Sequence, residues 1–316
     1  MKDVTTPTAN IGKFQDPFVT AKGEARASVA FSRPETLWFN TGTLCNIECV
    51  NCYIESSPTN DRLVYMTAAE VSDYLDQIAE TGMPFHEIGF TGGEPFMNPD
   101  IIAMLEDVLS RGFDCLVLTN AMRPMMRKRI KSGLEELQQT YGDKLTLRIS
   151  LDHHSKDRHD EERGKGSFDI TLEGMSWLRD VGIQMAVAGR TVWGDSDEES
   201  RTGYKSLFES HNFNIDAFSP SQTVLFPEMD ETVEVPEITT ECWSILGKAP
   251  DSPMCASSRM VVKRKGAEKP VVLACTLLAY DQAFEMGHSL SEAAEPVQLN
   301  HPHCAKFCVL GGASCS

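Results

Sequence analysis

The sequence contains no long apolar run. None of its stretches reaches the roughly 18 consecutive apolar residues that a membrane-spanning helix needs. The first residues, MKDVTTPTANIGKF, also lack the apolar core of a signal peptide. We therefore expect a soluble, cytoplasmic protein that does not bind membranes.

Positive charge is also scarce. The chain of 316 residues carries 29 Lys and Arg against 46 Asp and Glu, which gives a formal charge of −17, and it has no long basic run. A surface of this sign repels the phosphate backbone of nucleic acids. We expect no nucleic-acid partner.

The ten cysteines gather near the two ends of the chain. In a reducing compartment, clustered cysteines are more often metal ligands or reactive thiols than disulfide partners. Cys115 stands alone on an apolar segment and is predicted to be a core residue. The spacing of the other cysteines is the main functional signal.

Short apolar segments alternate with helical patterns over the first two thirds of the chain. Six such units predict a parallel sheet, and at this size a curved, partly closed α/β barrel of the (β/α)6 kind. Strands are expected at residues 36–42, 86–92, 114–120, 145–152, 183–193 and 213–219.

The first helix has clear start and stop signals. Thr67 occupies the position of an N-cap with Glu70 three residues later, and Gly82 follows the last apolar position. Further helices are expected within residues 98–112, 123–141, 167–182 and 198–210.

The alternation stops near residue 220, where Pro-rich sequence begins. We therefore predict three parts: an N-terminal extension over residues 1–35, the barrel over 36–220, and a small Cys-rich C-terminal extension over 221–316, formed by a β-hairpin and a helix. Active sites of such sheets lie at the C-terminal ends of the strands. Cys45, Cys49 and Cys52 follow the first strand at that edge.

These three cysteines form the pattern C-x-x-x-C-x-x-C. Structural zinc takes four protein ligands, usually from two separated pairs, whereas one loop with three thiols is incomplete for zinc. Three thiolates on a four-iron cluster leave one iron open for a substrate or cofactor. A zinc loop and three free core cysteines are the alternatives.

The stretch CNIECVNCY resembles the defining motif of the radical S-adenosylmethionine (SAM) superfamily. The resemblance implies a partial (β/α)6 barrel, a SAM-binding [4Fe–4S] cluster on Cys45, Cys49 and Cys52, and SAM itself. Asn51 departs from the pattern, since the family often has an aromatic residue there. The family holds the adenine at this position largely through backbone atoms, so Asn51 is a predicted SAM contact.

The stretch GFTGGEPFMNP ends the second predicted strand. Glycines allow close approach of the backbone to a ligand, and a carboxylate accepts hydrogen bonds from an ammonium group. By resemblance, Gly92, Gly93 and Glu94 bind the methionine amino group of SAM. The chain has neither a Rossmann fingerprint nor a Walker P-loop that would provide a competing nucleotide site.

Other positions resemble the branch of the family that carries C-terminal cluster domains. Ser150 and Asp152 would line the ribose or substrate side, and Arg163, in the sequence ERGKGSFD, would pair with the methionine carboxylate through its planar fork. Asn120 and Arg190, at the ends of the third and fifth predicted strands, would join them. The alternative for each is an ordinary loop residue.

Three histidines are candidate acid or base groups. His153, His154 and His159 lie among Asp, Lys and Arg residues, and such a cluster is more often a solvated face. We therefore assign no catalytic residue from the sequence.

The C-terminal region resembles the twitch or shortened SPASM extension. Cys255 and Cys275 bracket a predicted hairpin that turns at residues 263–270, and a helix is expected after it. The resemblance implies a fully ligated auxiliary [4Fe–4S] cluster on four of five cysteines: Cys255, Cys275, Cys304, Cys308 and Cys315. A zinc site on four of the five is the alternative, and Cys242 is either a core residue or a reactive thiol.

The resemblance also implies the reaction. A reductant such as flavodoxin or ferredoxin would supply an electron that cleaves SAM to a 5′-deoxyadenosyl radical, which abstracts hydrogen from the substrate in a net oxidation or rearrangement. We favour a small-molecule substrate because about 35 residues precede the first predicted strand, below the ~40 that an independent leader-binding domain needs. A peptide or protein substrate is the rival. A non-catalytic iron–sulfur sensor and a zinc-stabilised module are alternatives of another class, which would not need the Gly-Gly-Glu turn or Arg163.

Overall fold

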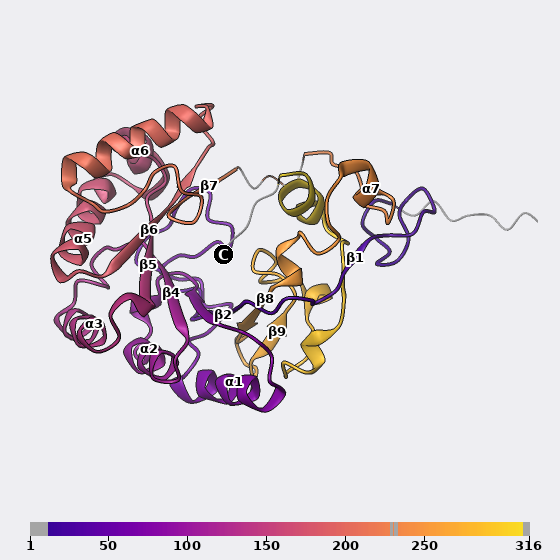
Figure 1. Ribbon diagram of the computed structural model, residues 1–316, viewed down its shortest axis with the longest axis horizontal. Helices are drawn as coiled ribbons and strands as arrows, with labels where there is room; N and C mark the ends of the chain where they lie inside the picture. Colours follow the sequence, from indigo (N-terminus) through magenta and orange to yellow (C-terminus); the bar gives the residue numbers. More distant parts are fainter. Residues whose placement is uncertain (1–11, 228–229, 231–232, 312–316) are drawn as a thin grey trace, which may run out of the picture.

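The protein is built around one curved sheet. The computed structural model describes residues 12–311 except 228–229 and 231–232. The eight strands of the sheet lie in the order β7-β6-β5-β4-β3-β2-β8-β9. Six neighbours are parallel and form the barrel (Figure 1): β2 (Thr36–Asn40), β3 (Glu87–Thr91), β4 (Asp114–Thr119), β5 (Leu145–Ser150), β6 (Gln184–Arg190) and β7 (Thr223–Phe226). The predicted partial barrel is confirmed, and it does not close.

Helices cover the outer face of the barrel (Figure 1). The capping box of Thr67 and Glu70 is present, and Gly82 ends the first helix in the left-handed conformation with φ 66°. None of the helices in the described part of the chain is long and apolar enough to cross a membrane. The barrel helices are α1 (Ala68–Thr81), α2 (Ile101–Ser110), α3 (Lys128–Tyr141), α4 (Lys156–Arg163), α5 (Ser167–Val181) and α6 (Asp197–His211).

Apolar strands explain why the barrel forms. All five residues of β2 are buried, as expected for a parallel strand with both faces covered. Its Leu37 and Phe39 belong to a core that extends across the sheet to Tyr204 on α6. This core holds the C-terminal ends of the strands in fixed positions.

The sixth strand does not lie where the sequence predicts it. Residues 213–219 form a turn, in which the Asp216 carboxylate accepts from the Phe218 N–H at 2.8 Å and the Asp216 carbonyl accepts from Ser219. The strand is β7, at Thr223–Phe226. The barrel therefore continues past the predicted boundary at residue 220.

The C-terminal region extends the barrel sheet. The predicted hairpin is present as β8 (Ser258–Val262) and β9 (Val271–Leu273), which pair antiparallel. Strand β8 also pairs in parallel with β2, so the hairpin continues the barrel sheet at its first strand. A short helix, α7 (Cys242–Leu246), precedes the hairpin.

The predicted helix after the hairpin is only partly correct. Residues 274–301 contain two short 3₁₀ turns, η4 (Gln282–Phe284) and η5 (Glu292–Ala294), and no α-helix. Gly287, with φ 99°, and Pro296 interrupt this stretch. A π-helix, η6 (Cys304–Leu310), follows and carries two of the cysteines.

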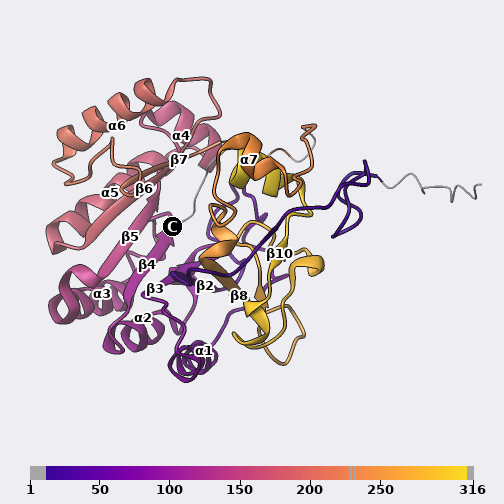
Figure 2. The same cartoon turned by 45° about the vertical axis from the view of Figure 1, so that its right-hand side comes forward.

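The N-terminal segment packs against the C-terminal region. Strand β1 (Ser28–Val29) pairs antiparallel with β10 (Val297–Gln298). Ala27 and Val29 share an apolar cluster with Cys255 and Cys304. Figure 2 shows the indigo N-terminal segment running beside the yellow C-terminal region.

Candidate functional site

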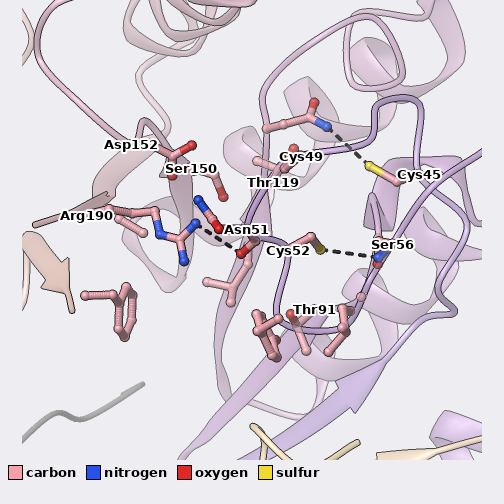
Figure 3. A pocket seen from close by; sticks show the side chains of 18 of the residues that line it. Cys45, Cys49, Asn51, Cys52, Ser56, Thr91, Thr119, Ser150, Asp152 and Arg190 are labelled. Carbon is pink, nitrogen blue, oxygen red and sulfur yellow. Dashed lines mark hydrogen bonds between the residues drawn. The ribbon is translucent and has the colours of Figure 1, made fainter. Parts of the chain in front are cut away.

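A cavity of about 180 Å³ lies at the C-terminal ends of the barrel strands. Its walls come from the loop after β2 and from the ends of β3, β4, β5 and β6 (Figure 3). Most of the site residues predicted from the sequence line it: Cys45, Cys49, Asn51, Cys52, Gly92, Gly93, Asn120, Ser150, Asp152, Arg163 and Arg190. Residues far apart in the chain thus meet at one place.

The three thiols lie on the loop that follows β2. The loop is closed at its base by a bridge between Leu44 and Ser57, and the Ser56 N–H donates to the Cys52 sulfur at 3.3 Å. Burial raises the pKa of Cys45 to about 12 and that of Cys49 to about 11. Metal binding therefore has to displace protons from these thiols.

Gly92 and Gly93 fit the cysteine loop against the end of β3. Gly92 has φ 138°, and a Cβ there would lie 2.5 Å from the Gly42 carbonyl oxygen. A Cβ on Gly93 would lie 2.3 Å from the Leu44 carbonyl oxygen. Side chains would clash at both positions, so the two glycines keep the loop and the strand end in contact while they line the cavity.

Glu94 lies behind the cavity wall, and its predicted contact with SAM stays a prediction. The side chain is 1% exposed and accepts from the Thr119 hydroxyl at 2.9 Å and from the Asn120 N–H at 2.9 Å. Burial raises the pKa of the Glu94 carboxyl to about 7. The contacts join the ends of β3 and β4, so Glu94 positions Asn120 at the cavity.

Asp152 and Arg163 form a buried ion pair in the cavity wall. Arg163 Nε donates to Asp152 at 2.5 Å and its Nη2 donates to the other carboxylate oxygen at 3.1 Å. A guanidinium has five N–H donors, so this pairing leaves donors for another ligand. Ser150 is the last residue of β5, two residues before Asp152, and both residues line the cavity.

Glu162 is a residue of the site that the sequence did not reveal. Its carboxylate accepts from the Asn51 N–H at 2.9 Å and from the Asn51 side-chain amide at 2.8 Å. Arg190 Nη1 donates to Glu162 at 2.7 Å and to the Asn51 carbonyl at 3.0 Å. Glu162 thus connects the cysteine loop to α4 and β6, and Asn51 makes these contacts where the family often has an aromatic residue.

We expect Glu162→Ala to destabilise the protein by roughly 3–5 kcal/mol, because it leaves the largely buried Arg190 unpaired. Its neighbour provides a matched control: Glu161 is exposed, so Glu161→Ala should change the free energy of unfolding by less than about 0.5 kcal/mol. Urea unfolding of the two variants measures both values. Equal effects would mean that the Glu162 contacts do not hold the loop.

The sequence predicted a solvated face for the histidines, and the structure shows instead that they are largely buried. His153 is 2% exposed and His159 is fully buried. Burial lowers the pKa of His159 to about 4, and its neutral ring accepts from the Asp152 N–H at 3.2 Å. His153 lies 3.1 Å from Asp195. These rings pack the loop that follows β5 and support Asp152.

A second, smaller cavity of about 20 Å³ lies in the C-terminal region. Its lining includes four of the predicted auxiliary ligands: Cys255, Cys275, Cys304 and Cys308. Cys315 lies outside the described residues. Leu277 lines both cavities, and its N–H donates to the Cys275 sulfur at 3.4 Å. Cys242 contacts the neighbouring apolar cluster.

Neither cavity has the compact donor set of a single metal ion. Within the described ranges, no group of three or more His, Cys, Asp or Glu side chains is arranged to hold one ion. Thiolates around a four-iron cluster are spread over separate iron atoms. Both donor sets consist of thiols, and such soft ligands suit iron–sulfur ligation.

Known proteins resemble this chain in sequence. The bacteriocin biosynthesis protein AlbA of Bacillus subtilis, which is named for the antilisterial bacteriocin subtilosin, is 32% identical over 63% of the chain and 44% of AlbA. The AdoMet-dependent heme synthase of Oleidesulfovibrio alaskensis is 26% identical over 52% of the chain and 43% of that protein. The chain matches less than half the length of either relative.

A solved structure shares the fold. The crystal structure of Streptococcus suis SuiB bound to S-adenosylmethionine superposes with a TM-score of 0.57 and 14% identity, over 81% of this chain and 63% of SuiB. At this identity the likeness shows the fold alone.

A family model described as the Radical SAM superfamily matches residues 39–200, a little over half of the chain. This range begins in β2 and reaches α6, so it holds the cysteine loop and the strand ends that line the first cavity. The chain therefore belongs to the radical SAM superfamily, which consists of enzymes that use a [4Fe–4S] cluster and SAM.

Proposed function

We propose that Cys45, Cys49 and Cys52 hold the [4Fe–4S] cluster and that SAM binds beside it in the first cavity. The observation that carries this proposal is the meeting of the three thiols with the ends of β3 to β6 around one cavity. When bound, the cluster supplies the electron for reductive cleavage of SAM.

The chain's own residues bind and orient SAM in this proposal. The backbone at Asn51, held by Glu162, faces the adenine, and the strand end at Gly92 and Gly93 faces the methionine amino group. Arg163 uses its remaining donors for the methionine carboxylate. Ser150 and Asp152 contact the ribose or the substrate.

The other walls of the cavity exclude water. They include the apolar side chains of Trp38, Ile54, Leu118, Phe226 and Leu277. A dry wall protects a reactive intermediate from side reactions with solvent.

The second set of cysteines holds an auxiliary [4Fe–4S] cluster in this proposal. Cys255, Cys275, Cys304 and Cys308 are the four ligands that the described residues support, because they line one cavity. Such a cluster would supply an electron acceptor close to the substrate.

The basic test is SAM cleavage. Anaerobically reconstituted protein should be brown, and with SAM and dithionite it should release 5′-deoxyadenosine, measured by liquid chromatography. Colourless protein that leaves SAM intact after reconstitution would contradict the proposal.

We propose a peptide as the substrate class, rather than the small molecule that the sequence favoured. AlbA, whose name places it in bacteriocin biosynthesis, shares 32% identity with the chain, against 26% for the heme synthase. The small-molecule class is retained as the second candidate because the heme synthase belongs to it. Flavodoxin or ferredoxin is the proposed reductant.

Isotope transfer distinguishes the two classes. Candidate peptides and metabolites from the same gene neighbourhood are deuterated and incubated with enzyme and SAM. We expect deuterium to pass into 5′-deoxyadenosine from a peptide, because the hydrogen abstracted from the substrate ends in that product. Transfer from a small metabolite, with none from any peptide, would overturn the proposed class.

A further inference from the structure

Arg259 is a buried cation with an unusual set of partners. It lies on β8 and is 1% exposed. Its guanidinium lies 3.8 Å from the centroid of the Phe31 ring. It donates to four backbone carbonyls at distances from 2.6 to 3.3 Å, those of Cys255, Ser258, Ala293 and Glu295.

Three other buried or largely buried arginines contact a carboxylate. The ion pairs are Arg26 with Glu237, Arg163 with Asp152, and Arg190 with Glu162. Among the residues that the structure describes, none supplies a carboxylate to Arg259. Backbone carbonyls satisfy its N–H donors and offset only part of its charge, so a buried cation of this kind is costly without an anion.

Two of the proposed cluster ligands, Cys255 and Cys275, lie near enough to Arg259 for their thiolates to stabilise its charge. The guanidinium lies next to the backbone of one of them, since Arg259 Nη1 donates to the Cys255 carbonyl at 2.6 Å. Thiols ligate iron as thiolates. A cluster in the second cavity would therefore place negative charge beside this arginine.

We propose that Arg259 is the counter-charge of the auxiliary cluster and that it raises the reduction potential of that cluster. This rests on the proposed function, because the cysteines must hold a cluster. A cluster that gains one electron carries one more negative charge, and a fixed nearby cation stabilises this reduced form more than the oxidised form. Arg259 thus favours transfer of an electron to the cluster.

The test isolates the auxiliary cluster in full-length protein in which Cys45, Cys49 and Cys52 are all changed to Ala. Arg259→Gln removes the charge and keeps some of the N–H donors. Arg259→Lys keeps the charge and loses the planar set of guanidinium N–H donors. Iron is counted, and the reduced fraction is followed by electron paramagnetic resonance during titration with dithionite and mediator dyes. At a fixed potential, the ratio of reduced to oxidised cluster should fall at least tenfold in Arg259→Gln, a shift of about 59 mV for a one-electron couple. It should stay within about threefold of the parent in Arg259→Lys.

A second variant leaves Arg259 and its hydrogen bonds in place. Phe31→Glu brings a carboxylate to the guanidinium and should lower the ratio in the same direction, whereas its matched control, Phe31→Leu, should not. If Arg259 had only a structural role, the variants would differ in stability, but the ratio of reduced to oxidised cluster would not depend on the charge introduced or removed. The role of Arg259 would be overturned if Arg259→Gln and Phe31→Glu both retained iron and both changed the ratio of reduced to oxidised cluster by less than twofold. A parent protein that binds no iron would instead overturn the auxiliary site itself, and the role of Arg259 with it.

Discussion

The Cys49→Ala variant should release no 5′-deoxyadenosine above background when it is incubated anaerobically with SAM and dithionite. Cys49 is the middle thiol of the loop that lines the first cavity. With two thiolates left, a four-iron cluster loses one of its three protein anchors, and the open iron that SAM needs is no longer set apart from the others. The expected loss of activity is complete.

Cys115→Ala is the matched control for this result. Cys115 is 2% exposed on β4 and packs in the barrel core, away from both cavities. The change should cost some stability through the small cavity that it creates, and it should leave iron content and SAM cleavage intact. Release at the wild-type rate from Cys49→Ala would contradict the ligand assignment.

The triple variant with Cys45, Cys49 and Cys52 changed to Ala should keep about half of the iron, since one of two four-iron clusters remains. The remaining iron would be held by the four cysteines of the second cavity. Iron and zinc are measured together by elemental analysis of the reconstituted protein.

The reciprocal variant supplies the control for that count. With Cys255, Cys275, Cys304 and Cys308 changed to Ala, the protein should also keep about half of its iron, now on the loop after β2. A triple variant without iron, or with zinc in its place, would show that the second cavity does not hold an iron–sulfur cluster.

The barrel could be predicted from the sequence because its signals are local. The apolar strands and the capped first helix need only neighbouring residues to be recognised, and β2 to β6 were expected within a few residues of their positions. Residues 213–219 misled the prediction for a physical reason. Phe213, Ile215 and Ala217 are buried in alternation like a strand, although Asp216 forms a turn that the pattern of apolar residues does not reveal.

Other features depend on contacts that no local pattern encodes. Ser28 pairs with Gln298, so the course of the N-terminal segment is decided at the far end of the chain. Glu162 and Glu161 are adjacent and chemically identical in the sequence, and only the folded loop decides that Glu162 holds Asn51. The sequence does not distinguish Arg259 from other basic residues, and only the structure shows that it is buried.

Leu277 forms part of the wall that separates the two cavities. The residue lines both, and its N–H donates to the Cys275 sulfur. A ligand that contacts Leu277 from the first cavity is therefore separated from the Cys275 sulfur only by Leu277 itself. Leu277 is thus in position to connect the contents of the first cavity with the C-terminal cysteines.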